Sequence, residues 1–100
     1  MTVTTEWQDS STDALFQAVL ALRTRDEAAG FFRDLCTLRE LEEMSHRWAI
    51  VQMLDTGVPY REIAEETGAS TATVTRINHW LQHGTGGYRM VLDRLARRRR

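Results

Sequence analysis

A chain of 100 residues with 42% hydrophobic and 27% charged residues has the composition of one ordinary globular domain. No apolar run approaches the ~20 residues that a membrane span needs, and the polar N-terminus is unlike a signal peptide, so we expect a cytoplasmic protein without a membrane partner. The net charge of −1 argues against a general polyanion binder, and the single cysteine excludes an internal disulfide.

Charge is unevenly distributed along the chain. Residues 1–44 contain nine acidic and four basic side chains, a net charge of −5, whereas residues 45–100 contain five acidic and nine basic ones, a net charge of +4. This asymmetry predicts positive potential over the C-terminal half. All thirteen basic residues are arginine, which suits contacts with phosphate and guanine, although coding bias explains this usage equally well.

The chain is expected to begin with an arm and a short helix. Residues 1–11 show no periodicity and are interpreted as a flexible N-terminal arm. Apolar residues at helical spacing then predict a helix over about 12–23, capped by Ser11 or Thr12.

Two further helices are predicted from the spacing of their capping residues. Thr24 with Glu27, and Thr37 with Glu40, have the spacing of a capping box. The second helix of the chain is expected to bury Ala28, Phe31, Phe32 and Leu35. The third helix should extend to Gly57, and its residues 48–54 (WAIVQML) are apolar nearly all the way round. Because so short a chain supplies little material to cover such a helix, we expect a second subunit to contribute.

Residues 60–83 predict a helix-turn-helix. Gly68 stands where the chain must turn, and Ser70 stands where a hydroxyl can cap the following helix. The second of the two helices is expected to bury one apolar face, formed by Val74, Ile77 and Leu81.

The opposite face of that second helix suits a DNA groove. It carries small or hydrogen-bonding side chains, and no carboxylate occurs between Gly68 and Gln82. The preceding helix carries three glutamates, which are expected to face away from DNA and leave Arg61 as the contact with the DNA backbone. Helix pairs joined by a glycine turn also occur in proteins that never meet DNA.

The C-terminal part is expected to contain a joint, a helix and a tail. GTGG (84–87) is interpreted as a flexible joint and a last helix is predicted from about Tyr88. Residues 97–100 form a basic tail that either favours the helix dipole and solubility or binds phosphate.

The order of these elements resembles the tryptophan repressor family, and most closely its small YerC/YecD-like branch. Four segments carry the resemblance and cover nearly the whole chain beyond residue 12: FFRDLCT (31–37), RELEEMSHRWAIVQMLDTG (39–57), YREIAEETGASTATVTRINHWL (60–81) and GTGGY (84–88). The resemblance implies an all-α fold of about six helices, in which two chains intertwine as a homodimer with one shared core. It also implies a single TrpR-like helical DNA-binding domain over residues 12–96.

The resemblance and the residue pattern together suggest a DNA-binding surface. Small and hydroxyl side chains can touch base edges, and basic side chains or helix N-terminal amides can hold phosphates. The candidate DNA-binding residues are Arg61, Ser70, Thr71, Ala72, Thr73, Thr75, Arg76 and His79.

The family's effector site is expected to survive only as a vestigial pocket. The resemblance places Thr37, Arg47 and Arg76 at the positions that surround tryptophan in the family's repressors. Ile77 and Trp80 replace two small residues there, and their bulk predicts that tryptophan is not the corepressor. Another small effector remains possible, and no cofactor is expected.

These expectations combine into a sequence-specific transcriptional regulator, with repression the expected mode, that binds a palindromic operator in double-stranded DNA as a homodimer. The alternative is a dimeric helical adaptor whose helix-turn-helix docks another protein. Enzymatic activity is not expected, because the chain has no Gly-rich phosphate loop and no nucleophile–base pair at a telling spacing. His79 and His83 lack a nearby cysteine or acid and are interpreted as a surface pair rather than a metal site.

Overall fold

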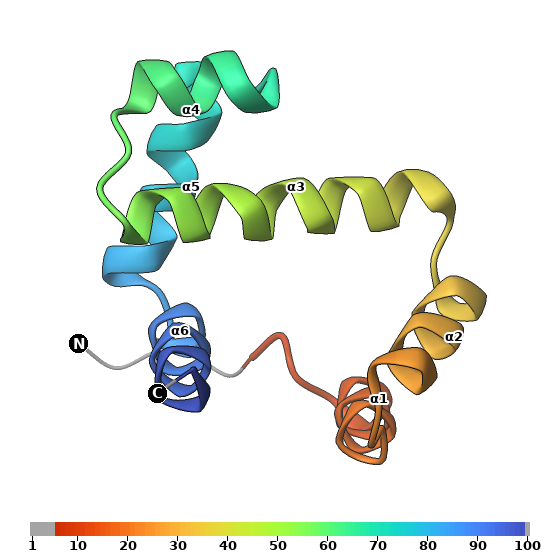
Figure 1. Cartoon of the computed structure of the whole chain (residues 1–100). Coiled ribbons are helices and arrows are strands. Elements are labelled where there is room, and N and C mark those ends of the chain that lie inside the picture. The colour runs from red at the N-terminus through yellow and green to blue at the C-terminus, as the bar shows by residue number, and fades with distance from the viewer. Residues whose placement is uncertain (1–5, 100) are drawn as a thin grey trace. The chain divides into compact units, whose positions relative to one another are not determined.

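A computed structural model describes residues 6–99, so residues 1–5 of the expected arm and Arg100 of the expected tail lie outside the described residues. Within that range the chain forms six α-helices and no strand (Figure 1). The helices are α1 (Ser10–Leu20), α2 (Arg25–Leu35), α3 (Leu38–Asp55), α4 (Tyr60–Thr67), α5 (Thr71–His83) and α6 (Gly87–Arg98). The predicted all-α fold class is confirmed. None of these six helices is both long and apolar enough to cross a bilayer.

The helix α1 begins two residues earlier than the sequence suggested. Asp9 is its N-cap: the Asp9 carboxylate accepts from the Thr12 N–H at 2.9 Å, and the Asp9 N–H donates to the Thr12 hydroxyl at 2.8 Å. The expected caps Ser11 and Thr12 are therefore wrong, and both lie within the first turn. A carboxylate in this position also interacts favourably with the helix dipole.

Threonine caps open the next two helices. The Thr37 N–H donates to the Glu40 carboxylate at 2.8 Å, and the Thr37 hydroxyl accepts from the Glu40 N–H at 3.1 Å, which confirms the predicted capping box of α3. The Thr24 hydroxyl accepts from the Glu27 N–H at 3.0 Å, but the Glu27 carboxylate accepts from Arg23 rather than from Thr24. Only half of the second predicted box is thus present.

The described residues fall into two units, and the boundary between them in the sequence falls within α3, between Glu42 and Glu43. In the first unit, neither α1 nor α2 contains a buried residue. The expected burial of the apolar face of α2 is wrong for the single chain: Leu35 is 51% exposed, and Ala28, Phe31 and Phe32 are half-buried. Because burial of apolar surface provides most of the stabilisation of a fold, the first unit has little of its own.

The second unit contains the core. In Figure 1, the C-terminal half of α3 lies between α4 and α6, and α5 runs from one side of α3 to the other. Each of these four helices contributes buried apolar side chains: Ile50, Val51, Ile63, Val74, Ile77, Leu81 and Leu92. The predicted inner face of the second helix of the helix-turn-helix is confirmed, since all three of its expected members are in this cluster.

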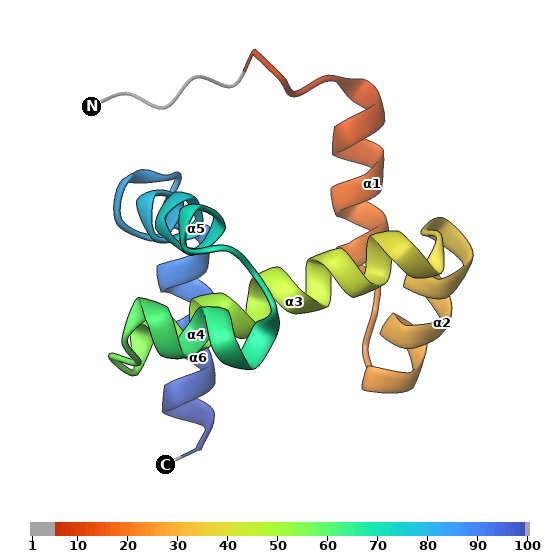
Figure 2. The same cartoon turned by 90° about the horizontal axis from the view of Figure 1, so that it is seen from above.

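The helix α6 crosses the C-terminal end of α3, as the two views in Figures 1 and 2 agree. An ion pair joins the two helices there, with the Arg89 guanidinium 2.8 Å from the Asp55 carboxylate and 3.5 Å from Asp93. The hydrogen bond to Asp55, reinforced by the charges of both carboxylates, holds the pKa of Arg89 above its ordinary value. The ion pair links the first turn of α6 to the last residue of α3.

Candidate nucleic-acid interface

The turn between α4 and α5 is formed by a glycine and a serine. Gly68 adopts a φ of 77°, which side chains with a Cβ rarely accept, and its N–H donates to the Ala64 carbonyl at 2.9 Å to end α4. Ser70 is the N-cap of α5, and its hydroxyl accepts from the Thr73 N–H at 3.1 Å. Both roles confirm the sequence interpretation. The start of α5 is therefore held at a fixed position relative to α4.

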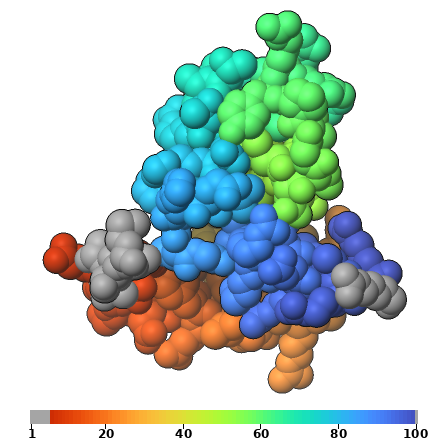
Figure 3. Space-filling model, turned by 90° about the vertical axis from the view of Figure 1, so that its left-hand side faces the viewer, coloured from red at the N-terminus to blue at the C-terminus, as the bar shows by residue number. Residues whose placement is uncertain are grey.

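The outward face of α5 carries no acidic side chain. Five of the predicted DNA-binding residues of this helix are exposed: Thr71, Ala72, Thr75, Arg76 and His79. Figure 3 shows α5, in cyan to light blue, at the surface beside the green α4. We call Thr71, Ala72, Thr75 and His79 the outer row. Thr71, Ala72 and His79 each lie three or four residues from Thr75, so the four share a helix face.

Thr73 lies apart from the outer row. It is half-buried, and its hydroxyl is 3.0 Å from the Ser70 hydroxyl, which donates to it. Its side chain lines cavities that also involve Arg47 of α3. The structure therefore places Thr73 on the inner side of α5, where it supports the helix start.

The helix α4 presents basic and acidic side chains together. Arg61 is exposed, as are Glu62, Glu65 and Glu66. The positive charge predicted for this helix is thus accompanied by three negative charges, whereas α5 contains none. The contrast makes α5 the better surface for a polyanion.

A cavity of about 430 Å³ brings together four of the five residues predicted for an effector pocket. The fifth, Thr37, belongs to the other unit. Two residues that the sequence analysis missed, Thr73 and Tyr88, complete the lining. Thr73 could have been found because it precedes Arg76 by three residues, whereas Tyr88 comes from beyond a loop and gives no local signal. The full lining is Arg47, Thr73, Arg76, Ile77, Trp80 and Tyr88.

The two bulky residues of this cavity behave differently. Ile77 is 7% exposed and belongs to the core, whereas Trp80 is 57% exposed and forms part of the wall. Trp80 therefore does not fill the cavity of the single chain. Arg47 and Arg76 place two guanidinium groups in the lining, and no carboxylate is part of it.

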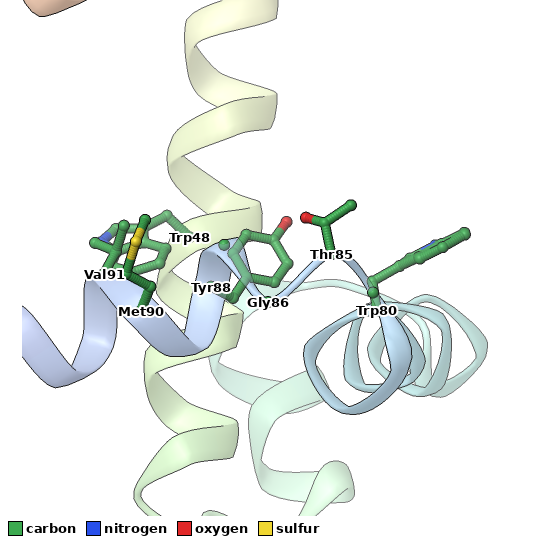
Figure 4. A pocket seen from close by; sticks show the side chains of 9 residues that line it. Trp48, Trp80, Thr85, Gly86, Tyr88, Met90 and Val91 are labelled. Carbon is green, nitrogen blue, oxygen red and sulfur yellow. The ribbon is translucent and has the colours of Figure 1, made fainter. Parts of the chain in front are cut away.

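A second, apolar cavity of about 530 Å³ lies between α3, the end of α5 and the start of α6. In Figure 4, the Trp48 ring stands beside Met90 and Val91 at one end of this cavity, and Trp80 stands on α5 at the other end. Met90 is 45% exposed and Val91 is 38% exposed. The sequence analysis assigned both residues to the last helix but did not foresee the cavity.

The two histidines of α5 form a surface pair. The ring centroids of His79 and His83 are 5.1 Å apart. Within residues 6–99, no group of three histidine, cysteine, aspartate or glutamate side chains is placed to hold a metal ion.

The fold and this face define a small all-helical protein built around a helix-turn-helix. Residues 10–96 match the family model described as Trp repressor protein. The chain belongs to the Trp repressor family, which is a family of DNA-binding regulators rather than enzymes. The resemblance noted in the sequence is confirmed.

Relatives from three bacteria support this membership. The uncharacterized protein YerC of Bacillus subtilis is 42% identical over 83 residues, which cover 83% of this chain and 80% of YerC. The crystal structure of a TrpR-like protein from Eubacterium eligens has 42% identity and a TM-score of 0.86, covering 93% of this chain and 96% of that one. A Staphylococcus aureus protein proposed to be a Trp repressor has 41% identity and a TM-score of 0.84, covering 91% of both chains.

Proposed function

We propose that this protein is a transcriptional regulator that binds a palindromic operator as a homodimer, with α5 of each chain in the major groove. The observation that carries the proposal is the outer row of α5, an exposed and acid-free face on a helix whose start is fixed by Gly68 and Ser70. In helix-turn-helix dimers the two recognition helices enter successive major grooves about 34 Å apart.

Each predicted residue has a role in this proposal. The outer row touches base edges, and the amides at the Ser70-capped start of α5 hold a phosphate together with Arg61. Thr73 acts by supporting the start of α5 rather than by contacting DNA. Arg76 is exposed and also lines the 430 Å³ cavity, so it either holds a phosphate or faces a bound effector.

Exposed apolar surface supports the homodimer. The helices α1 and α2 contain no buried residue, and Leu20 is 82% exposed. In the second unit, Trp80 and Met90 leave about half of their surface uncovered. A second copy of the chain supplies the apolar surface that would cover these side chains. The shared core implied by the family resemblance would arise in this way.

DNA binding is tested with fluorescence anisotropy on a labelled pool of genomic fragments. We expect the wild type to bind, with an affinity that falls as salt is raised. Arg61→Ala should weaken binding to all fragments and reduce the salt slope by about one, because it removes one phosphate contact. Arg25→Ala is the matched control, since the Arg25 side chain is 92% exposed on α2 and belongs to the other unit. A wild type without measurable affinity or salt dependence would exclude the regulator.

We also propose that tryptophan is not the effector, because Ile77 and Trp80 stand where the resemblance implies small residues. The two guanidinium groups of the cavity instead suit a small anion. Calorimetry with tryptophan should give no saturable heat. Trp80→Ser removes an exposed indole that lines the cavity, and Trp7→Ser removes another exposed indole outside it. The heat measured with tryptophan should change more in Trp80→Ser than in Trp7→Ser. Saturable binding of tryptophan to the wild type would contradict the proposal.

A further inference from the structure

The hydroxyl of Thr75 is engaged within its own helix. Its oxygen lies 2.9 Å from the Thr71 carbonyl oxygen, one turn earlier. Because a carbonyl oxygen only accepts, the Thr75 hydroxyl must be the donor. The residue is nonetheless exposed and lies in the middle of the outer row.

This bond determines what Thr75 offers to a ligand. With its proton directed at the helix backbone, the hydroxyl presents lone pairs and the side chain presents a methyl group. No carboxylate lies between Gly68 and Gln82, so α5 has no stronger acceptor nearby. Ala72 lies three residues earlier on the same face and adds a second small apolar group.

Base pairs differ in the partners that they provide for such a surface. In the major groove, guanine presents only acceptors, and thymine presents an acceptor and a methyl group. The donors are the exocyclic amino groups, N6 of adenine and N4 of cytosine. Each base pair therefore offers one donor to an accepting oxygen, on adenine in A·T and on cytosine in G·C, and the two pairs place it at different positions in the groove.

We propose that Thr75 is a specificity-determining residue of the operator-binding surface, and that its oxygen accepts a hydrogen bond from an exocyclic amino group in the major groove. The inference rests on the proposed function and adds to it the direction of one hydrogen bond, in which the base donates and Thr75 accepts. The bond to Thr71 also fixes the rotamer of Thr75, so no rotamer freedom is lost when the contact forms.

The experiment is selection from a random duplex pool, repeated with three proteins. The wild type should enrich one base pair at one position of each half-site, and the adenine or cytosine of that pair then carries the expected donor. Thr75→Val keeps the shape and the methyl group but removes the oxygen, so it should lose that preference by roughly fivefold. Thr75→Ser keeps the oxygen and should retain the preference. Melting curves by circular dichroism establish that both variants fold.

Modified duplexes then identify the donor. If adenine is selected, replacing it by purine removes only the N6 amino group, and if cytosine is selected, pyrimidin-2-one removes only the N4 amino group. Each replacement should weaken wild-type binding by roughly fivefold and leave Thr75→Val unaffected.

Four results would overturn the inference. Unchanged wild-type binding after removal of the exocyclic amino group would mean that the Thr75 oxygen does not accept from it. Unchanged preferences in Thr75→Val would mean that Thr75 does not contact a base. Strong binding without any base preference would mean that the protein binds DNA but that Thr75 does not determine its specificity. Absence of all duplex binding by the wild type would instead remove the proposed function itself.

Discussion

Thr37 and Glu40 show how two side chains set the start of a helix. They exchange hydrogen bonds of 2.8 and 3.1 Å at the first turn of α3. The bond from the Thr37 backbone, followed by its side chain, holds the pKa of Glu40 below its ordinary value of 4.5. The ionised carboxylate is thus favoured by the folded state. Its contribution to stability is present above pH 4.5 and is lost as the pH falls through the lower folded-state pKa.

Glu40→Gln isolates this charge, because glutamine can still accept the Thr37 bond. We expect the variant to melt at a lower temperature than the wild type at neutral pH. The difference should shrink as the pH is lowered below 4.5, where the wild-type carboxylate becomes protonated. Thermal melts from neutral pH to below pH 4.5 measure this difference in melting temperature. Glu42→Gln, outside the capping box, serves as the control. An equal and pH-independent effect of both substitutions would show that the Glu40 charge is not the cause.

Gly84 illustrates how the end of the helix α5 depends on a missing side chain. It is the C-cap, and its N–H donates to the Trp80 carbonyl at 2.9 Å. A Cβ at Gly84 would collide with that same carbonyl oxygen. Relief of the collision must move backbone rather than a flexible side chain, and Trp80 lines both cavities.

We therefore predict that Gly84→Ala lowers the free energy of unfolding by ~1–3 kcal/mol, the usual cost of a strained backbone position. Gly87→Ala is the matched control, since a Cβ there meets only the Thr85 hydroxyl at 3.7 Å, and alanine favours the start of α6. Urea denaturation at equal protein concentration measures both. Equal stabilities of the two variants would mean that α5 can end without glycine.

Local signals in the sequence were sufficient to predict the buried face of α5. They were insufficient to predict the cap of α1 or the residues that surround α5. Val74, Ile77 and Leu81 are spaced for one helix face, so their burial followed from periodicity alone. The cap of α1 was misplaced because Ser11 and Thr12 are as capable of capping as Asp9. Tyr88 and the apolar cavity depend on where α6 crosses α3, where contacts join residues far apart in the sequence, such as Arg89 and Asp55. No short sequence pattern encodes that crossing.

The uneven distribution of burial bears on the proposed homodimer. All seven buried core residues lie in the second unit, while the first unit, with its exposed Leu20 and Leu35, has none in α1 or α2. Residues 1–44 carry a net charge of −5 and residues 45–100 carry +4, so the two halves attract one another, within one chain or between two. The uncovered apolar surface favours burial against a second chain, and the stability of the proposed homodimer should then depend on protein concentration.

Met90→Glu tests this dependence. Met90 is 45% exposed in the single chain, so a carboxylate there stays hydrated in a monomer but is desolvated once a second chain covers the apolar cavity. We expect light scattering to show a dimer for the wild type and a shift to monomer for the variant. The melting temperature should fall by ten degrees or so, since burial of an unpaired charge costs about 2 kcal/mol or more. Gln82→Glu adds the same charge at an exposed polar position of α5 and should remain dimeric. A monomeric wild type whose melting temperature is independent of concentration would contradict the shared core, and with it the paired presentation of α5 to DNA.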